Sequence, residues 1–297
     1  MTESPAAVVV VTHRGADPMV RACLSSIDAA TARPSVTVVV DNSDGPVLAA
    51  DAYGPGVSDV VRMDNRGFGA AANAGIRRGR DLAAVGAPVV VLNDDLEVAR
   101  DWLEPLVAAL DADDRLGAVQ PALVRSGTDR INSLGVELDR FGAGSDIGLD
   151  RPLVSLGDPL PIEIFTAGAV LLRAGFVDDT GGFDERYFLY YEDVDLALRG
   201  AEQGWRYRCE TSSIVHHHGG STTGGMGDAL VRYQERNRLW VAARFGSPVT
   251  FGRAVWLSVR RLRHQPRDAH LRALVTGLAG TPGAAIRRIR RRVSGTR

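Results

Sequence analysis

The sequence contains no lysine: each of its 35 basic residues is an arginine, set against 36 acidic residues. Cysteine is almost as scarce, since Cys23 and Cys209 are the only two. Two cysteines so far apart build neither a disulfide framework nor a metal-binding knuckle. We therefore predict that both are small packed side chains and that the protein works in a reducing cytoplasm.

Long apolar runs are missing as well. No segment approaches the roughly 20 apolar residues that span a bilayer, and the short run at 6–11 follows an acidic start and lacks a signal-peptide cleavage pattern. We expect a cytoplasmic protein that could still lie against a membrane. In other respects the chain is typical of globular proteins, because 45% of its 297 residues are hydrophobic and 24% are charged.

Charge is distributed unevenly along the chain. From residue 251 onward the sequence has twelve arginines and a single acidic residue, Asp268, whereas the whole chain has a net charge of −1. The sequence therefore joins an acidic body to a basic tail.

Val-rich segments alternate with helical patterns in the first hundred residues. The runs at 6–13, 35–43 and 87–95 are continuous and apolar, which is typical of strands buried on both faces of a parallel sheet. Between them, 17–31 and 69–85 space their apolar residues as helices do. This βαβαβ pattern predicts an α/β fold of the kind that binds nucleotides.

The pattern is looser after residue 95. It predicts, in order, a helix at 101–114, a short strand at 117–126, loops or an edge hairpin at 140–159, a strand and a short turn at 163–181, and a helix from near Glu192. Neither an internal repeat nor a low-complexity linker interrupts the chain. We predict one catalytic domain at 1–245, with a nucleotide-binding half at about 1–100 and an acceptor half at about 101–245, and an Arg-rich amphipathic helical tail at 246–297.

Gly67, Gly69 and Ala72 have the spacing of a dinucleotide-binding fingerprint. Such a fingerprint should follow the first strand directly, because the pyrophosphate binds where that strand turns into its helix. Here two stronger strands precede it, and the turn after the first strand has no glycine triad. The position of the motif along the chain therefore argues against a dehydrogenase.

The asparagines of the same segment indicate another use. Asn65 and Asn73 can bond the backbone and cap a turn, while Gly69 lets a helix start close to a neighbouring chain segment or a ligand. A tightly packed loop and helix without any ligand is the alternative interpretation.

Seven motifs, taken in their order, resemble the family 2 glycosyltransferases of the GT-A fold. They are VVVVTHR, VVVDNSDG, NRGFGAAANAG, VVVLNDDLEV, TAGAVLLR, GGFDERYFLYYEDVDLALR and IVHHHGGST. The resemblance covers about residues 6–240. Within the family, the sequence is most similar to the bacterial rhamnosyltransferase-like branch, which acts in cell-wall and surface-polysaccharide assembly. The resemblance implies a transferase that moves a sugar from a dTDP- or UDP-linked donor to a glycan or lipid-linked acceptor, with Mg²⁺ or Mn²⁺.

Carboxylates at a strand end can hold a divalent cation that neutralises and orients phosphates. Asn93, Asp94 and Asp95 follow an apolar run in this way. The family pattern is Asp-x-Asp or Asn-x-Asp, so the resemblance makes Asp95 the leading metal ligand. Asp94 would then contact the ribose or support the metal ligand, and an acidic loop with a purely structural role is the alternative.

Three consecutive histidines follow the last apolar run. They cannot all reach one ion from a strand, because neighbouring side chains alternate between its faces. The resemblance assigns the metal or the diphosphate to His216 rather than to His217 or His218.

Asp41 closes the second predicted strand, as Thr12 closes the first. A carboxylate accepts a hydrogen bond from a pyrimidine N–H, so the base contact that the resemblance implies for Asp41 favours a uridine or thymidine donor. A strand-end aspartate that only forms a turn is the alternative. The predicted donor-binding residues are Thr12, Asp41, Asn65, Gly69, Asn73, Asn93 and Asp94.

Three carboxylates, Glu192, Asp193 and Asp195, open a predicted helix whose positive N-terminal end favours their ionised forms. Alone, this pattern is typical of a helix cap. The resemblance makes Asp193 the general base that takes the acceptor proton with inversion at the anomeric carbon, and Glu192 the residue that orients the acceptor. We expect Asp195 to bind its own helix or Arg199.

Three further residues are assigned to the acceptor side by the resemblance alone. Gly168 lies in the strand that passes beneath the sugar, and Arg236 and Asn237 face the active-site loop. A charged amphipathic helix at 231–245 with no such role is the alternative.

Arginines flank apolar stripes in the tail, formed first by Val255, Val259 and Leu262 and then by Ile286, Ile289 and Val293. Such stripes suit an anionic cytoplasmic membrane surface. Nucleic acid is not expected, because no stacking aromatics are interleaved with the arginines at 287–292. We predict peripheral docking at the inner face of the cell membrane.

Two other functions share the α/β layout. A sugar-phosphate nucleotidyltransferase should have a Gly- and Arg/Lys-rich triphosphate loop after the first strand, and residues 12–18 lack the full signal. A non-catalytic nucleotide-sugar binding protein is the second alternative, and it differs in needing no general base.

Overall fold

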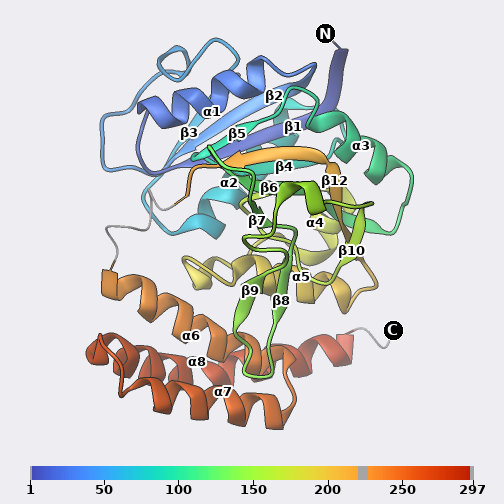
Figure 1. The fold of residues 1–297 in the computed structure, drawn as a ribbon. Helices are drawn as coiled ribbons and strands as arrows, with labels where there is room; N and C mark the ends of the chain where they lie inside the picture. The colour runs from blue at the N-terminus through green and yellow to red at the C-terminus, as the bar shows by residue number, and fades with distance from the viewer. Residues whose placement is uncertain (1, 220–226, 295–297) are drawn as a thin grey trace.

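The computed structural model of the protein describes residues 2–219 and 227–294 and, within them, all side chains except those of residues 2, 155 and 282–294. A ten-stranded sheet crosses the molecule (Figure 1). Eight of its strands follow the order β10-β12-β6-β11-β4-β1-β2-β3, and in addition β5 pairs with β12 and β7 pairs with β6. Its strands are β1 (Thr2–Thr12), β2 (Ala32–Asp41), β3 (Asp59–Arg62), β4 (Val89–Asn93), β5 (Leu96–Val98), β6 (Leu116–Arg125), β7 (Ile131–Ser133), β10 (Leu160–Ile162), β11 (Ala169–Leu172) and β12 (Arg206–His217).

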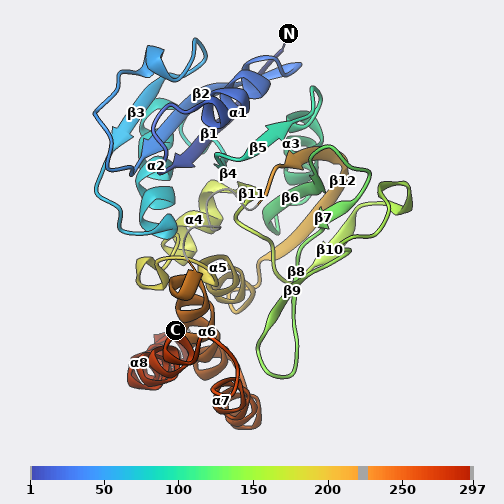
Figure 2. The same ribbon diagram turned by 60° about the vertical axis from the view of Figure 1, so that its left-hand side comes forward.

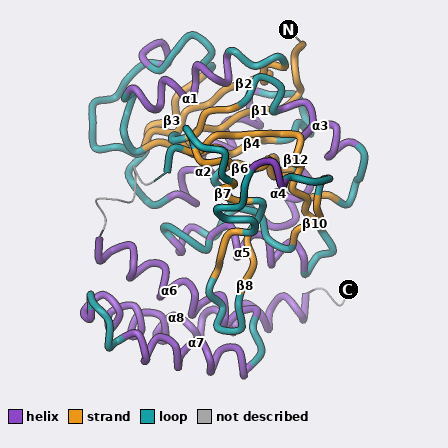
Figure 3. The backbone as a smooth tube through the Cα atoms, viewed as in Figure 1, coloured by secondary structure: helices purple, strands orange, loops and turns teal. Residues whose placement is uncertain are grey.

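Helices cover both faces of this sheet (Figure 3). A small second sheet pairs β8 (Val136–Leu138) with β9 (Gly144–Asp146). The helices are α1 (Pro18–Asp28), α2 (Phe68–Leu82), α3 (Leu103–Asp111), α4 (Ala174–Thr180), α5 (Glu192–Ala201), α6 (Gly227–Phe245), α7 (Pro248–Arg261) and α8 (Arg267–Ser294), with short 3₁₀ turns η1 (Ala50–Ala52), η2 (Leu153–Ser155) and η3 (Glu185–Tyr187).

The predicted Val-rich strands form the centre of the sheet. Strand β1 runs parallel to both β2 and β4, and its valines alternate between two cores. Val8 and Val10 pack with residues of α1 and α3, whereas Val9 and Val11 pack with residues of α2 and α5. Both faces of these strands are therefore buried, which explains why the strands are apolar throughout. The expected α/β fold with helices on both faces of the sheet is confirmed.

The chain leaves β1 for β2 on one side and returns to β4 on the other. The carboxyl ends of these parallel strands therefore diverge at one edge of the sheet, which is the place where open α/β sheets leave a crevice for ligands. Thr12, Asp41 and Asn93 end the three strands at this edge.

Several elements differ from the sequence expectations. Strand β3 was not expected, and helix α4 occupies the expected short turn. Strand β6 covers nearly the residues that were expected, but it lies inside the sheet, between β11 and β12. A side chain at Gly117 would approach Phe176 to 2.6 Å, so this glycine admits a helix against the strand and does not end it.

Helices α6, α7 and α8 pack together at the end of the molecule farthest from the sheet (Figures 1 and 2). The Arg238 side chain is buried among them and donates to Glu235, to Ser258 and to the carbonyl of Ala254. Trp240 donates to the carbonyl of Gly277 at 3.1 Å. The segment predicted as a separate tail thus shares a core with α6, and an independent domain at 1–245 stays a proposal.

The apolar stripe predicted for the tail is split by this packing. Val255 packs on the small core of Leu239 and Ala242, whereas Val259 is exposed. The side chains of Ile286, Ile289 and Val293 lie outside those that the structure describes. Among the described residues, no helix combines the length and the hydropathy needed to cross a bilayer.

Candidate active site

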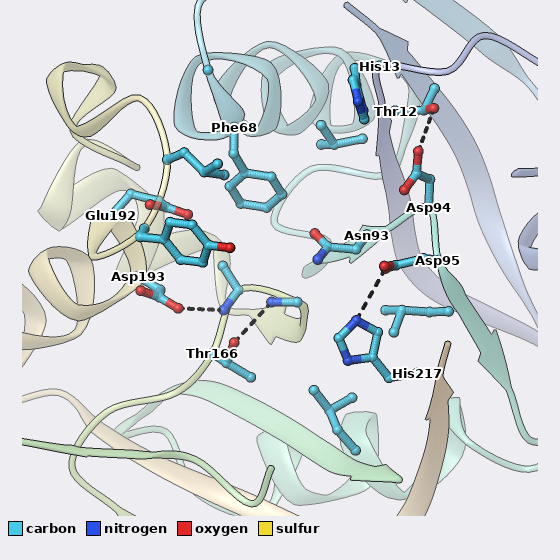
Figure 4. Close-up of a pocket in the computed structure, with 18 of the residues that line it drawn as sticks. Thr12, His13, Phe68, Asn93, Asp94, Asp95, Thr166, Glu192, Asp193 and His217 are labelled. Atoms are coloured by element: carbon cyan, nitrogen blue, oxygen red, sulfur yellow. Dashed lines mark hydrogen bonds and ion pairs between the residues drawn. The ribbon is translucent and has the colours of Figure 1, made fainter. Parts of the chain in front are cut away.

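A cavity of about 360 Å³ opens at the carboxyl ends of β1 and β4 (Figure 4). One wall consists of strand ends and carries Thr12, Asn93, Asp94, Asp95 and His217. The opposite wall is formed by the N-terminus of α5 and the aromatic loop before it, with Glu192 and Asp193. Two groups of carboxylates from distant parts of the chain therefore face one space.

Asp94 is held by the end of β1. Thr12 Oγ1 donates to Asp94 Oδ2 at 2.7 Å, and Arg14 Nε lies 3.4 Å from the same oxygen. Burial raises the pKa of Asp94, against the hydrogen bond from Thr12 and the charge of Arg14. Because β1 and β4 are adjacent parallel strands, the first strand end positions the carboxylate of the second.

Asp95 faces a histidine on strand β12, but not the predicted one. His217 Nε2 lies 3.4 Å from Asp95 Oδ1. Burial would raise the pKa of Asp95, but the hydrogen bond and the charge of His217 hold it below its usual value. His216 lies opposite Glu97 in the antiparallel pairing of β12 with β5, and its side chain does not line the cavity. Successive strand residues alternate between faces, so only one of the two can point at the carboxylate.

Asn132 holds the other side of the His217 ring. Its Oδ1 lies 2.5 Å from His217 Nδ1, so Nδ1 carries the hydrogen of this bond and Nε2 is turned to Asp95. A partner on the second ring nitrogen fixes the orientation and tautomer of a metal-binding histidine. The sequence analysis did not identify Asn132, because this residue reaches His217 only through the pairing of β7 with β6, which no local sequence pattern reveals.

We expect Asn132→Leu to weaken Mn²⁺ binding about 10- to 100-fold, because the ring loses its fixed tautomer. Asn132→Asp keeps an acceptor at this position and should bind nearly as well as the wild type. Calorimetric Mn²⁺ titration in the presence of nucleoside diphosphate measures the affinity, and ¹⁵N NMR of metal-free protein reads the tautomer. His218→Gln is the matched control. Equal affinity of Asn132→Leu and wild type would contradict a role for Asn132 in orienting His217 toward a metal ion.

The aromatic loop before α5 has a strained backbone. Phe188, Tyr190 and Tyr191 all have positive φ, between 65° and 68°. Each such residue costs on the order of 1–3 kcal/mol. Asn237 offsets the strain, because its Nδ2 donates to the carbonyls of Tyr187, Leu189 and Tyr190 at 2.7–3.0 Å.

Two other predicted site residues also hold loops and do not line the cavity. Arg236 donates to the carbonyl of Tyr187 at 2.7 Å. Asn73 exchanges hydrogen bonds with the backbone of Phe183, at 2.8 and 2.9 Å. The structure places both at the base of the aromatic loop, where they act on the cavity only through its wall.

Gly67, not Gly69, lines the cavity. Its φ is +90°, and a Cβ there would come within 2.2 Å of the carbonyl oxygen of Phe188. Only glycine fits this position, because Phe68 N donates to that carbonyl and draws the aromatic loop onto α2. Gly69 packs against Phe183 outside the cavity, and Asn65, which bonds Gly67 N, lines the rim.

Asp41 also lies outside the cavity. One carboxylate oxygen accepts from Tyr53 and Arg62, both at 2.7 Å, and the other accepts from Ser43 N. These bonds hold the pKa of Asp41 below its usual value against the effect of burial. The next residue, Asn42, lines the cavity instead, and its buried Oδ1 has no hydrogen-bond partner within the described chain.

Asp193 lies on the helix wall of the cavity with both oxygens hydrogen-bonded. The backbone N–H groups of Ala167 and Val194 donate to it at 3.2 and 2.8 Å. Figure 4 shows Asp193 on the wall opposite Asp95. Burial raises the pKa of Asp193 despite these bonds. Gly168, the next residue after Ala167, lines the cavity between Asp193 and Asn93.

Glu192 is 6% exposed, and among the described residues its Oε2 has no hydrogen-bond partner. Burial, followed by the charge of Asp193, raises the pKa of Glu192 to about 8. The raised pKa favours the protonated carboxyl, which can donate a hydrogen bond. Asp195 is different: it pairs with Arg199 at 2.6 Å and with Arg244 at 2.5 Å, which confirms its expected structural role.

The free energy of unfolding should fall between about pH 4.5 and pH 8, by up to about 1.4 kcal/mol per pH unit, because folded Glu192 keeps a proton that the unfolded chain releases. Glu192→Gln cannot lose this proton, so the variant should gain stability relative to the wild type as the pH rises through this range. Urea unfolding of both proteins at pH 5, 6.5 and 8 measures the difference. A constant difference across the three pH values would contradict the raised pKa.

Comparison with known proteins identifies the chain. The family model described as Glycosyl transferase family 2 matches residues 7–166, more than half of the sequence. The chain belongs to glycosyltransferase family 2. The N-acetylglucosaminyl-diphospho-decaprenol L-rhamnosyltransferase of Mycobacterium tuberculosis is 30% identical over 242 residues, which cover 73% of this chain and 77% of that protein. This family 2 protein is therefore a glycosyltransferase, and the nucleotidyltransferase alternative does not hold.

Solved structures agree on the fold of this family 2 enzyme. GalNAc-T7 with UDP, GalNAc and Mn²⁺ has a TM-score of 0.63 at 15% identity, covering 91% of this chain and 53% of that one. The Pyrobaculum calidifontis mannosyltransferase with GDP-Man and Mn²⁺ has a TM-score of 0.53 at 20% identity, covering 95% and 77%. The fold is thus the expected GT-A-like arrangement with added C-terminal helices. At such low identity these likenesses show the fold alone.

Proposed function

We propose that this enzyme moves a sugar, with inversion, from a dTDP- or UDP-linked donor to a hydroxyl of a cell-envelope glycan or lipid-linked acceptor. The observation that carries the proposal is one cavity with two carboxylate walls: Asp95 beside His217 on the strand side, and Glu192 with Asp193 on the helix side. The relative with 30% identity supports rhamnose as the sugar and a polyprenyl diphosphate as the lipid, since its name states both.

The strand side suits the diphosphate of the donor. Thr12, Asn93 and Asp94 line its wall next to Asp95 and His217. A carboxylate and an imidazole are ligands that Mn²⁺ accepts, and Mg²⁺ commonly binds through one or two carboxylates completed by phosphates and water. Within the described chain no group of three or more ligating side chains gathers, which fits a cation shared with the donor. Asp95 and His217 would hold the cation, whose charge neutralises the departing diphosphate.

The helix side suits the acceptor. Asp193 takes the proton of the attacking hydroxyl while its oxygen bonds to the anomeric carbon and the bond from that carbon to the diphosphate breaks. The oxygen enters on the face opposite the leaving group, so the configuration inverts. The raised pKa of Asp193 favours this role, because a base is most effective when its pKa approaches the working pH.

Glu192 would orient the acceptor as a hydrogen-bond donor. Its buried Oε2 lacks a partner within the described chain, and a hydroxyl of the acceptor would supply one. This assignment separates the two neighbouring carboxyls by role: a protonated Glu192 binds, and Asp193 accepts the proton.

The donor class can be tested by calorimetry and thermal shift with UDP, dTDP, GDP and NAD, each with and without Mn²⁺ or Mg²⁺. We expect one pyrimidine diphosphate to raise the Tm only when metal is present. Binding of GDP alone would overturn the pyrimidine assignment, and metal-independent binding of NAD alone would overturn the proposed donor.

The proposed acceptor indicates where in the cell the enzyme acts. We propose that the enzyme acts on the cytoplasmic side of the cell membrane as a peripheral protein, because a lipid-linked acceptor lies in that membrane. The Arg-rich C-terminal helices support this placement.

A further inference from the structure

Helices α7 and α8 lie at the end of the molecule farthest from the sheet (Figures 1 and 2). Several of their large apolar side chains are exposed. A soluble surface normally shows such residues singly, so a set of them on two packed helices is informative. We call these residues and the arginines around them the docking face. Its apolar members are Val249, Trp256, Val259, Leu271, Val275 and Leu278.

On α7 the apolar residues lie opposite the packed side. Ala254 and Ser258 are buried against α6. At 100° per residue, Trp256 and Val259 lie well away from that side of the helix, and they are 52% and 50% exposed. Both side chains therefore face away from the side on which α7 packs against α6.

The same division recurs on α8. Ala269 and Ala273 are buried, whereas Leu271 and Val275 are 51% and 58% exposed. Leu278 continues the exposed side one turn further along. Ala269, Ala273 and Leu274 therefore lie on the packed side of the helix, and Leu271, Val275 and Leu278 lie on the side that does not pack.

Positive charge surrounds these side chains. Arg261 is engaged by Glu235 of α6. The other described arginines of the two helices and their connection are exposed, and one exposed acid accompanies them. The arginines are Arg253, Arg260, Arg263, Arg267 and Arg272, and the acid is Asp268.

An aromatic pair joins the docking face to the body of the enzyme. Trp256 stacks on Phe141, at the tip of the β8–β9 hairpin, with ring centroids 6.0 Å apart. Arg260 lies over the Trp256 ring and Arg140 over the Phe141 ring. Tryptophan with adjacent arginines is typical of the level of lipid headgroups, where an amphipathic ring and a cation are both stable.

We propose that the docking face binds a bilayer of anionic phospholipid, with Trp256 and the aliphatic side chains between the headgroups and the arginines at the phosphates. Helices of this composition lie in the plane of the interface, and each arginine adds attraction to anionic lipid. A nucleic-acid site would need several aromatic residues for stacking on bases. Apart from Trp256, the apolar residues of the docking face are aliphatic, and aliphatic side chains do not stack on bases. This inference rests on the peripheral placement proposed above and names the surface that would make the contact, whereas the residues of the proposed reaction lie apart from that surface.

Flotation of the full-length protein with vesicles of phosphatidylcholine, with and without phosphatidylglycerol, tests the surface. We expect binding only to the anionic vesicles and release at high salt. Arg263→Gln/Arg272→Gln should lower the partition coefficient about 25-fold, since each charge is worth about fivefold. Trp256→Ser/Val259→Ser should lower it at least about tenfold.

Matched controls come from exposed positions elsewhere: Val85→Ser/Val154→Ser and Arg77→Gln/Arg100→Gln should bind as the wild type does. Asp193→Asn should also bind normally, so failure of docking is distinguished from failure of the proposed chemistry. Absence of binding to anionic vesicles, or equal binding by the docking-face variants, would overturn the proposal. So would light scattering that shows a dimer which Trp256→Ser/Val259→Ser dissociates, because a second copy would then cover the face.

Discussion

Asp193→Asn should reduce kcat for sugar transfer by about 10²–10⁴-fold, because the variant lacks the group that accepts the hydroxyl proton. The amide has the size of the carboxylate and keeps one oxygen that can accept from the backbone N–H of Ala167 or Val194, the two groups that bond Asp193. The fold and the strand side of the cavity should therefore persist. Steady-state kinetics with a pyrimidine-linked donor measure the loss.

Donor affinity provides the decisive control for this variant. Calorimetry should give the same Kd for the metal-bound nucleoside diphosphate in Asp193→Asn and the wild type, because Asp193 lies on the wall opposite Asp95. Asp111→Asn, at an exposed position on α3, should keep full activity. A variant that transfers sugar at the wild-type rate would support a non-catalytic role for Asp193 and remove the proposed base.

Asp95→Ala should abolish metal-dependent donor binding and lower kcat/KM at least about a thousandfold, because the diphosphate loses the charge that stabilises its departure. The increase in Tm that Mn²⁺ and nucleoside diphosphate produce together in the wild type should disappear. His217→Ala should lose the same increase in part, as expected of the second side chain that faces the ion.

Two controls make the Asp95 result specific. Asp114→Ala removes a fully exposed carboxylate and should behave as the wild type. His216→Ala removes the histidine that the sequence favoured, and its Mn²⁺ affinity should be unchanged because β12 turns this side chain away from the cavity. Loss of Mn²⁺ binding in His216→Ala but not in His217→Ala would reverse our placement of the ligand.

The contrast between these two histidines shows where sequence reasoning ends. A run of three histidines reveals that one face of a strand can present an imidazole, but not which face. The register of β12 against β5 and β6 decides it, and a shift of one residue would exchange His216 and His217. Asp41 and Asn42 pose the same problem at the end of β2, where the aspartate bonds Arg62 and the asparagine lines the cavity.

Two asparagines on helices show a different limit. Asn73 of α2 was expected to bind the donor, and it bonds the backbone of Phe183 instead. Asn237 of α6 was expected to face the active-site loop, and it bonds carbonyls of the aromatic loop. Their partners are 110 and 47 to 50 residues away in the chain. A local pattern contains no information about such partners, so it cannot separate a ligand-binding amide from one that fixes a strained loop.

The sequence by itself determined the α/β class, the central valine strands, the carboxylate motifs and the family, because periodicity and motif order are local properties of the chain. Tertiary structure alone decided that β6 is a central strand, that Asp95 meets His217 with Asn132 behind it, and that the basic tail packs on α6. Each of these depends on contacts between distant residues. Packing and strand register select those contacts from many that the sequence pattern permits.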